Sequence, residues 1–123
     1  MSLVDRLDLT GKVIVVTGAG NGGIGTGVAK LLAEAGASIM GLDVSKEKFA
    51  ALDEALAGTP GPHAQRVIDA RRPEDVEGAI QAAVDELGPL WGLVHVVGGM
   101  MDGQWKQISE SDYAAWDLSL IHI

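Results

Sequence analysis

The sequence predicts an α/β fold in which a doubly wound parallel sheet of about four strands carries helices on both faces. Three observations lead to this class. Strand-like and helix-like segments alternate along the 123 residues, neither a repeat nor a linker interrupts them, and the apolar content is mostly Ala, Val, Leu and Ile. Because each helix must carry the chain back to begin the next strand, the alternation implies parallel pairing through right-handed crossovers.

Apolar periodicity predicts the first four elements. The β-branched run "KVIVV", residues 12–16, predicts a strand that is buried on both faces. A helix follows and ends at Gly36, because a glycine after the last periodic residue is typical of a helix end. "ASIMGLDV" predicts a second strand that ends at Asp43, and Ser45 is placed to cap the next helix. The apolar positions are Ile24, Val28, Leu31, Leu32 and Ala35 in the first helix and Phe49, Leu52 and Leu56 in the second.

The second half of the chain continues the alternation. "GTPGP", residues 58–62, predicts a loop, and "AQRVIDA" predicts a short third strand that is less apolar than the first two. Pro73, followed by two acidic residues, opens a helix that ends at Gly88. "LWGLVHVV", residues 90–97, predicts a fourth strand, and "SESDYAAWDLSL" predicts the start of another helix. The apolar stripe of the helix after Pro73 is Val76, Ile80, Val84 and Leu87.

Composition and charge exclude several classes of function. The net charge is −8 and only Arg71 and Arg72 are adjacent basic residues, whereas a nucleic-acid footprint needs clustered Lys and Arg. With no cysteine, the chain has no disulfide, no thiolate nucleophile and no cysteine metal site. "MSLVDRLDLTGK" lacks the apolar core of a signal peptide, and no apolar run approaches the roughly 18 residues of a membrane span. We therefore expect a cytoplasmic protein that binds neither nucleic acid nor membrane.

The segment "TGAGNGGIGTG" has six glycines in eleven positions and lies between a predicted strand and a predicted helix. Glycines there let the backbone turn tightly and approach a pyrophosphate, whose charge the helix N-terminus stabilises. The G-x-G-x-x-G pattern of dinucleotide-binding proteins fits in two registers, Gly18/Gly20/Gly23 and Gly20/Gly22/Gly25. The alternative is a turn whose glycines only permit close packing of the helix on the sheet.

Two aspartates end predicted strands at the same edge of the sheet. Asp43 lies 18 residues beyond Gly25, where a carboxylate accepts hydrogen bonds from the ribose hydroxyls of a dinucleotide. A carboxylate there also repels a 2′-phosphate, which favours NAD over NADP; the alternative is a solvated aspartate ahead of the next helix. Asp69 is placed to face the adenine amino group, or else is a turn residue. Arg71 and Arg72 are expected to form a solvated pair, with Arg71 also within range of a phosphate.

Long stretches of the chain resemble the N-terminal half of the short-chain dehydrogenase/reductase family, whose fold is of the Rossmann type. The resemblance covers residues 8 to about 118 and rests on "LTGKVIVVTGAGNGGIGTGVAKLLAEAGA", "LDVS" and "ELGPLWGLVHVVGG". The family motif T-G-x-x-x-G-I-G is matched with one extra residue, so the phosphate loop is expected to bulge. The residues that the resemblance assigns to cofactor binding are Gly18, Gly20, Asn21, Gly23, Ile24, Gly25, Asp43, Asp69, Ala70, Val97 and Gly98.

A second family motif, N-N-A-G after the fourth strand, falls on residues 95–98, where only the glycine is kept. In the family this motif holds the central sheet and borders the cofactor's ribose. His95 takes the place of a polar group in it. A histidine in a strand is more often a core residue with satisfied hydrogen bonds than a ligand, and we expect the same of His95.

By resemblance, the full-length protein transfers a hydride between a nicotinamide and an alcohol or carbonyl substrate. In the family a Tyr, a Lys four residues on and an upstream Ser handle the proton. The only tyrosine here is Tyr113, and four residues on lies Asp117, which would raise the tyrosine's pKa. We therefore expect no catalytic residue and no metal site in this chain. "SLIHI", residues 119–123, resembles translated adaptor sequence, so we expect residues 1–123 to be a partial dinucleotide-binding domain with a non-native tail.

Two other functions are compatible with these patterns. One is a dinucleotide-binding module that catalyses nothing, and the other is a methyltransferase, whose glycine-rich loop and acidic residue occupy similar positions. The Thr-Gly lead and the Gly-Ile-Gly entry to the helix favour the dehydrogenase over the methyltransferase. Family members are usually dimers or tetramers, so the full-length protein is expected to be a homo-oligomer.

Overall fold

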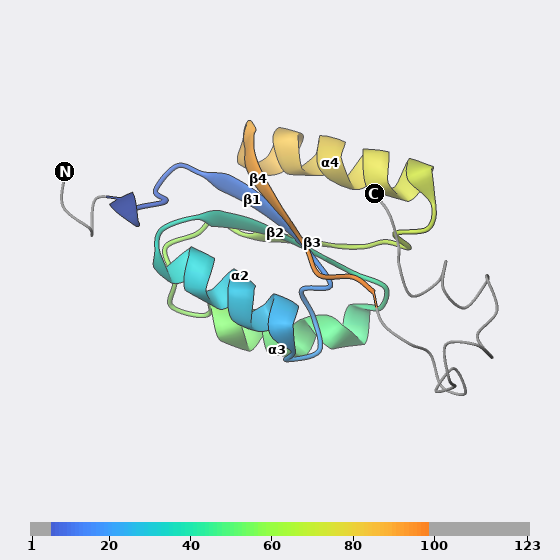
Figure 1. Ribbon diagram of the computed structural model, residues 1–123, viewed down its shortest axis with the longest axis horizontal. Helices are drawn as coiled ribbons and strands as arrows, with labels where there is room; N and C mark the ends of the chain where they lie inside the picture. The colour runs from blue at the N-terminus through green and yellow to red at the C-terminus, as the bar shows by residue number, and fades with distance from the viewer. Residues whose placement is uncertain (1–5, 99–123) are drawn as a thin grey trace, which may run out of the picture.

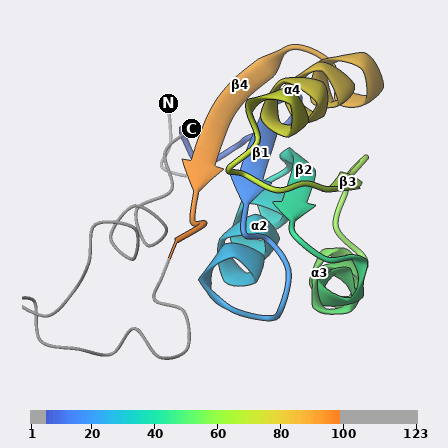
Figure 2. The same cartoon turned by 90° about the vertical axis from the view of Figure 1, so that its right-hand side faces the viewer.

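The computed structural model describes residues 6–98, and four parallel strands form one sheet in the order β3-β2-β1-β4. The strands are β1 (Val13–Thr17), β2 (Ser38–Asp43), β3 (Ala64–Val67) and β4 (Leu90–His95). The helices are α2 (Ile24–Glu34), the 3-10 turn η1 (Lys46–Lys48), α3 (Phe49–Leu56) and α4 (Pro73–Leu87). Helices α2 and α3 cover one face of the sheet and α4 covers the other (Figures 1 and 2). The doubly wound α/β fold is confirmed.

The core consists of two layers, one on each face of the sheet. Strand β1 is buried along its whole length, and its alternate side chains enter opposite layers. Ile14 and Val16 pack toward α2 and α3, whereas Val15 packs with Met40 and with alanines of α4. This placement fixes β1 rigidly, so the loop that follows it starts from a well-defined point.

The predicted apolar stripe of α2 is wrong at Ile24 and Leu31, whereas Leu32 packs against the core as predicted. Ile24 and Leu31 are 77% and 67% exposed, whereas small residues of the helix, Ala29 and Ala33 among them, are buried. Helix α4 likewise buries Ala79, Ala82 and Ala83, and its predicted core residue Val84 is exposed, whereas the predicted residues Val76, Ile80 and Leu87 pack against the core. Small side chains let a helix lie close to a sheet, so the alanines of both helices are more deeply buried than their larger apolar residues.

The predicted cap at Ser45 is also wrong in part. Ser45 precedes η1, and its side chain makes no capping hydrogen bond. Helix α3 begins only at Phe49, after this turn, and buries Phe49, Leu52 and Leu56 as predicted. The turn places Lys48 beside the end of β2.

His63 lies just before β3 and completes the hydrogen bonding of β2. The β2–β3 ladder starts at the pair Met40 and Ala64, so Ile39 has no strand partner on that side. The Ile39 N–H instead donates to Nδ1 of His63 at 3.1 Å. The Thr59 hydroxyl donates to the Leu56 carbonyl at 2.7 Å, so Nε2 of His63, 2.7 Å away, is the donor to Thr59. These contacts require a neutral imidazole with its proton on Nε2.

The free energy of unfolding is expected to fall as the pH drops from 7.5 to 5.5. Burial lowers the pKa of His63 from its ordinary value of 6.5, so protons bind more tightly to the unfolded chain. The stabilisation by neutral His63 is therefore present above pH 6.5 and is lost below it. Urea unfolding of wild type and His63→Asn at both pH values measures this loss. Asn keeps an acceptor for the Ile39 N–H and cannot titrate, so equal acid sensitivity of the two proteins would contradict the assignment.

Candidate functional site

The candidate site lies at the carboxyl edge of the sheet, where the chain changes direction. Strands β2 and β3 follow β1 to one side, and β4 then pairs with the other side of β1. Ligands of open α/β sheets bind outside the carboxyl ends of the strands at such a switch point. The loops after β1, β2, β3 and β4 all lie at this edge.

The glycine loop after β1 contains three left-handed residues. Gly18 has a φ of 68°, and Asn21 and Gly22 follow with φ values of 67° and 70°. Two consecutive left-handed residues make a tight local turn within the loop. The loop ends at Gly23, the N-cap of α2, which has extended backbone and where an added Cβ would meet no atom within 4 Å.

Helix α2 packs against the end of β1 through Gly25. A Cβ at this position would lie 2.0 Å from the carbonyl oxygen of Gly18 and 3.2 Å from Cα of Ala19. A Cβ at Gly20 would lie 2.7 Å from Cβ of Lys48. Close packing thus explains these two glycines, as the alternative interpretation proposed. It does not explain Gly23, where an added Cβ would meet no protein atom within 4 Å.

Thr26, which is not among the predicted site residues, holds the loop in shape. Its hydroxyl lies 2.5 Å from the carbonyl oxygen of Ala19 and 2.9 Å from that of Gly20, and it accepts the N–H of Gly22 at 3.1 Å. A threonine in the first turn of a helix that follows a glycine loop is the signal that identifies such a residue, since its hydroxyl can reach back to nearby backbone groups.

The N-terminus of α2 is well suited to an anion. No side chain caps it, and its first turn contains no acidic residue. Helix α4 differs, because Glu74 and Asp75 lie in its first turn and complement its positive end. The first backbone N–H groups of α2 have no partner within the helix, so a phosphate could accept their hydrogen bonds.

Asp43 is buried beside this loop and is not the solvated aspartate of the alternative interpretation. Its residue exposure is 8%. One carboxylate oxygen accepts the N–H of Gly20 at 2.9 Å, and the other accepts the N–H of Val44 at 2.7 Å. A carboxylate can accept about four hydrogen bonds, so both oxygens keep acceptor capacity. Nζ of Lys48 lies 3.7 Å from Oδ1.

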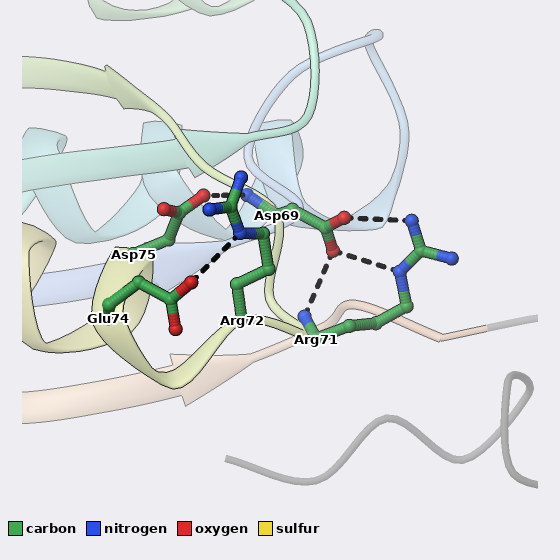
Figure 3. A network of polar contacts seen from close by, with 5 residues as sticks. All are labelled: Asp69, Arg71, Arg72, Glu74 and Asp75. Atoms are coloured by element: carbon green, nitrogen blue, oxygen red, sulfur yellow. Dashed lines mark hydrogen bonds and ion pairs between the residues drawn. The ribbon is translucent and has the colours of Figure 1, made fainter.

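Asp69 lies two residues beyond the end of β3 and is held by Arg71 (Figure 3). The backbone N–H and Nε of Arg71 donate to one carboxylate oxygen at 3.0 and 2.9 Å, and Nη2 donates to the other at 2.7 Å. These side-chain hydrogen bonds lower the pKa of Asp69 to about 2. The N–H of Asp69 donates to Asp75 at 3.0 Å. Arg72 pairs with Glu74 at 3.1 Å, so the two arginines are exposed but each is paired with an acid.

Comparison with known proteins identifies the family. The family model described as short chain dehydrogenase matches residues 12–120. The chain belongs to the short-chain dehydrogenase family.

The relatives that this chain matches are about twice as long as the chain, or longer. D-xylose 1-dehydrogenase of Caulobacter vibrioides is 36% identical over 89% of the chain, which covers 41% of that relative. 3beta-hydroxysteroid dehydrogenase 2 of Eggerthella lenta is 34% identical, with the same 89% and 41% coverage. A double mutant of a Serratia marcescens short-chain dehydrogenase/reductase superposes with a TM-score of 0.77 at 28% identity, covering 93% of this chain and 45% of that one. The chain thus spans less than half the length of these relatives.

The side chain of Thr17 links the end of β1 to the end of β4 through hydrogen bonds. Its hydroxyl oxygen lies 2.7 Å from Nδ1 of His95 and accepts the N–H groups of Val96 and Val97 at 3.1 and 3.4 Å. The expectation that His95 lies in the core is wrong, since the residue is exposed, although its ring is hydrogen bonded. A Cβ at Gly18 would lie 3.3 Å from the nitrogen of Val97, so the end of β4 touches the glycine loop.

The structure therefore brings the predicted cofactor residues to one edge of the sheet. The glycine loop contacts Asp43 directly and Val97 closely, and buried Ala70 follows Asp69 on the loop after β3. Tyr113 lies outside the described residues. Within residues 6–98, no group of three or more His, Asp and Glu side chains is arranged to hold a metal ion. None of the helices in this part of the chain has both the length and the apolar character that crossing a bilayer requires.

Proposed function

We propose that this chain is the cofactor-binding part of an NAD-dependent oxidoreductase that acts on an alcohol or carbonyl substrate. The observation that carries the proposal is the hydrogen bond of 2.9 Å between the Gly20 N–H and Asp43. It joins a buried carboxylate to the glycine loop that leads into the uncapped N-terminus of α2. A carboxylate after the second strand and a helix N-terminus after the glycine loop are the two groups that bind the ribose and the pyrophosphate of a dinucleotide.

Each predicted residue has a role in this proposal. The backbone around Gly20, Asn21 and Gly23, with the first turn of α2, would bind the pyrophosphate, and Gly18 and Gly25 would keep strand and helix close. Asp43 would accept hydrogen bonds from the adenosine ribose and disfavour a 2′-phosphate. The remaining assignments are Ile24 at the helix entry, Asp69 and Ala70 on the adenine side, and Val97 and Gly98 beside the second ribose.

The bound cofactor would supply or accept the hydride. This chain's own residues would bind and orient it, since the proposal assigns no catalytic residue to them. The Tyr, Lys and Ser that move the proton would lie in the part of the full-length protein that corresponds to the rest of its relatives. We propose further that the full-length protein is a cytoplasmic homo-oligomer.

Asp43→Ala is expected to lower NAD affinity by roughly ten- to a hundredfold and to reduce the preference for NAD over NADP. The variant loses a charged acceptor for the ribose hydroxyls, which is worth roughly 1.5–3 kcal/mol, and it loses the repulsion of a 2′-phosphate. Isothermal titration calorimetry of the 123-residue chain with both cofactors measures the ratio of the two affinities. Asp85→Ala, which removes an exposed aspartate of α4, is the control for the change in net charge.

Two results would count against the proposal. An unchanged ratio of NAD to NADP affinity in Asp43→Ala would remove Asp43 from the ribose site. Binding of S-adenosylmethionine by the wild-type chain, without binding of NAD, would favour the methyltransferase interpretation instead.

A further inference from the structure

Contacts of the Lys48 backbone hold this residue against the glycine loop. Its carbonyl oxygen accepts the N–H of Asn21 at 2.9 Å, and its Cβ lies so close to Gly20 that a Cβ there would approach it to 2.7 Å. The main chain of Lys48 is therefore fixed at the mouth of the candidate site. Lys48 is the last residue of the 3-10 turn η1, and the side chain of Ser45 makes no capping hydrogen bond to this turn.

The side chain of Lys48 leads to Asp43. Nζ lies 3.7 Å from Oδ1 of Asp43, and the side chains are 39% and 9% exposed respectively. The ammonium group thus lies beside the carboxylate on a side chain that is more exposed to solvent than the aspartate. Lys46, two residues earlier on the same turn, is exposed, and the ion pairs found within residues 6–98 do not include it.

We propose that Lys48 is a second determinant of cofactor selectivity, which gives the site affinity for a 2′-phosphate that Asp43 alone would exclude. The inference rests on the proposed function, because it assumes that Asp43 marks the adenosine ribose. A lysine carries a compact charge on a flexible four-carbon stem. Its ammonium group can remain on Asp43 when the ribose carries a hydroxyl, and can turn to a phosphate when the ribose carries one.

The size of the effect on 2′-phosphate affinity depends on the burial of Asp43 and on the exposure of Lys48. Asp43 is buried and hydrogen bonded to two backbone N–H groups, so it stays in place and continues to repel a phosphate. Lys48 is partly exposed, and a partly exposed charge contributes a factor of about five in affinity rather than a reversal of preference. The site should therefore prefer the unphosphorylated ribose and still bind the phosphorylated one measurably.

A simple structural role for Lys48, neutralising Asp43, would give a different result. Loss of such a role would weaken binding of both kinds of nucleotide together. A role in selectivity changes the ratio of the two affinities, so this ratio is the quantity to measure.

The test uses the full 123-residue chain and two probes, 5′-AMP and 2′,5′-ADP, with calorimetry as the readout. In Lys48→Gln, 2′,5′-ADP should bind about fivefold more weakly, and 5′-AMP within about twofold of wild type. Lys48→Arg should keep most of the affinity for 2′,5′-ADP. Lys46→Gln, the matched control with the same loss of charge, should alter neither affinity.

The outcomes separate this inference from the proposed function. If wild type binds 5′-AMP but the ratio of affinities is unchanged in Lys48→Gln, or if wild type does not bind 2′,5′-ADP, the inference is wrong and the dinucleotide site stands. If wild type binds neither probe, the proposed function fails and the inference fails with it.

Discussion

Gly25→Ala is expected to lower the free energy of unfolding by about 3 kcal/mol or more. The added methyl group would lie 2.0 Å from the carbonyl oxygen of Gly18 and 2.7 Å from its carbonyl carbon. Both are backbone atoms at the end of β1, the most deeply buried strand, so they cannot rotate away as a side chain would. Relief requires helix α2 to move off the sheet, and this movement would disrupt the packing of Ala29 and Ala33.

Gly27→Ala is the matched control for this prediction. Gly27 lies in the same helix, is exposed, and an added Cβ would meet no atom within 4 Å. Alanine there should stabilise the helix by about 0.5–1 kcal/mol, because it reduces the conformational freedom of the unfolded chain. Urea unfolding of the two variants measures the difference. If both variants unfold within about 1 kcal/mol of wild type, α2 does not lie as close to β1 as described.

The order of elements could be predicted because it depends on local patterns. The β-branched run before Thr17, Gly36 after the first helix and Pro73 at the start of α4 each act within one turn or one strand. The rotation of α2 could not be predicted in the same way. Periodicity favoured burial of Ile24 and Leu31, whereas the approach of the helix to the sheet through Gly25 required small residues on the inner side.

The site could be predicted in outline for a similar reason. Residues that follow parallel strands share one edge of the sheet, so Asp43, Asp69 and the glycine loop were expected to lie near one another. Their partners depend on side chains that are distant in sequence or on loop conformation. The pairing of Asp69 with Arg71 and the approach of Lys48 to Asp43 are of this kind, and only the three-dimensional structure shows them.

Gly23→Val is expected to abolish NAD binding without unfolding the protein. Gly23 has a φ of −90° and extended backbone, and an added Cβ would meet no protein atom within 4 Å, so a valine is accommodated when no ligand is present. In the proposed complex the pyrophosphate would approach this backbone closely, and a branched side chain would fill the space it needs. Thermal unfolding and calorimetric titration with NAD therefore report separately on the fold and on the site.

Gly27→Val is the matched control for Gly23→Val. It places the same side chain one turn further along α2, also in open space, so it reproduces any cost of a β-branched residue in the helix. We expect Gly27→Val to bind NAD as wild type does. Retained NAD affinity in Gly23→Val would mean that the pyrophosphate lies elsewhere on the loop, and the register Gly20/Gly22/Gly25 would then be the better assignment. Loss of NAD binding in both variants would mean that a valine anywhere in the first turns of α2 prevents binding. The result would then give no support to a specific contact between the pyrophosphate and Gly23.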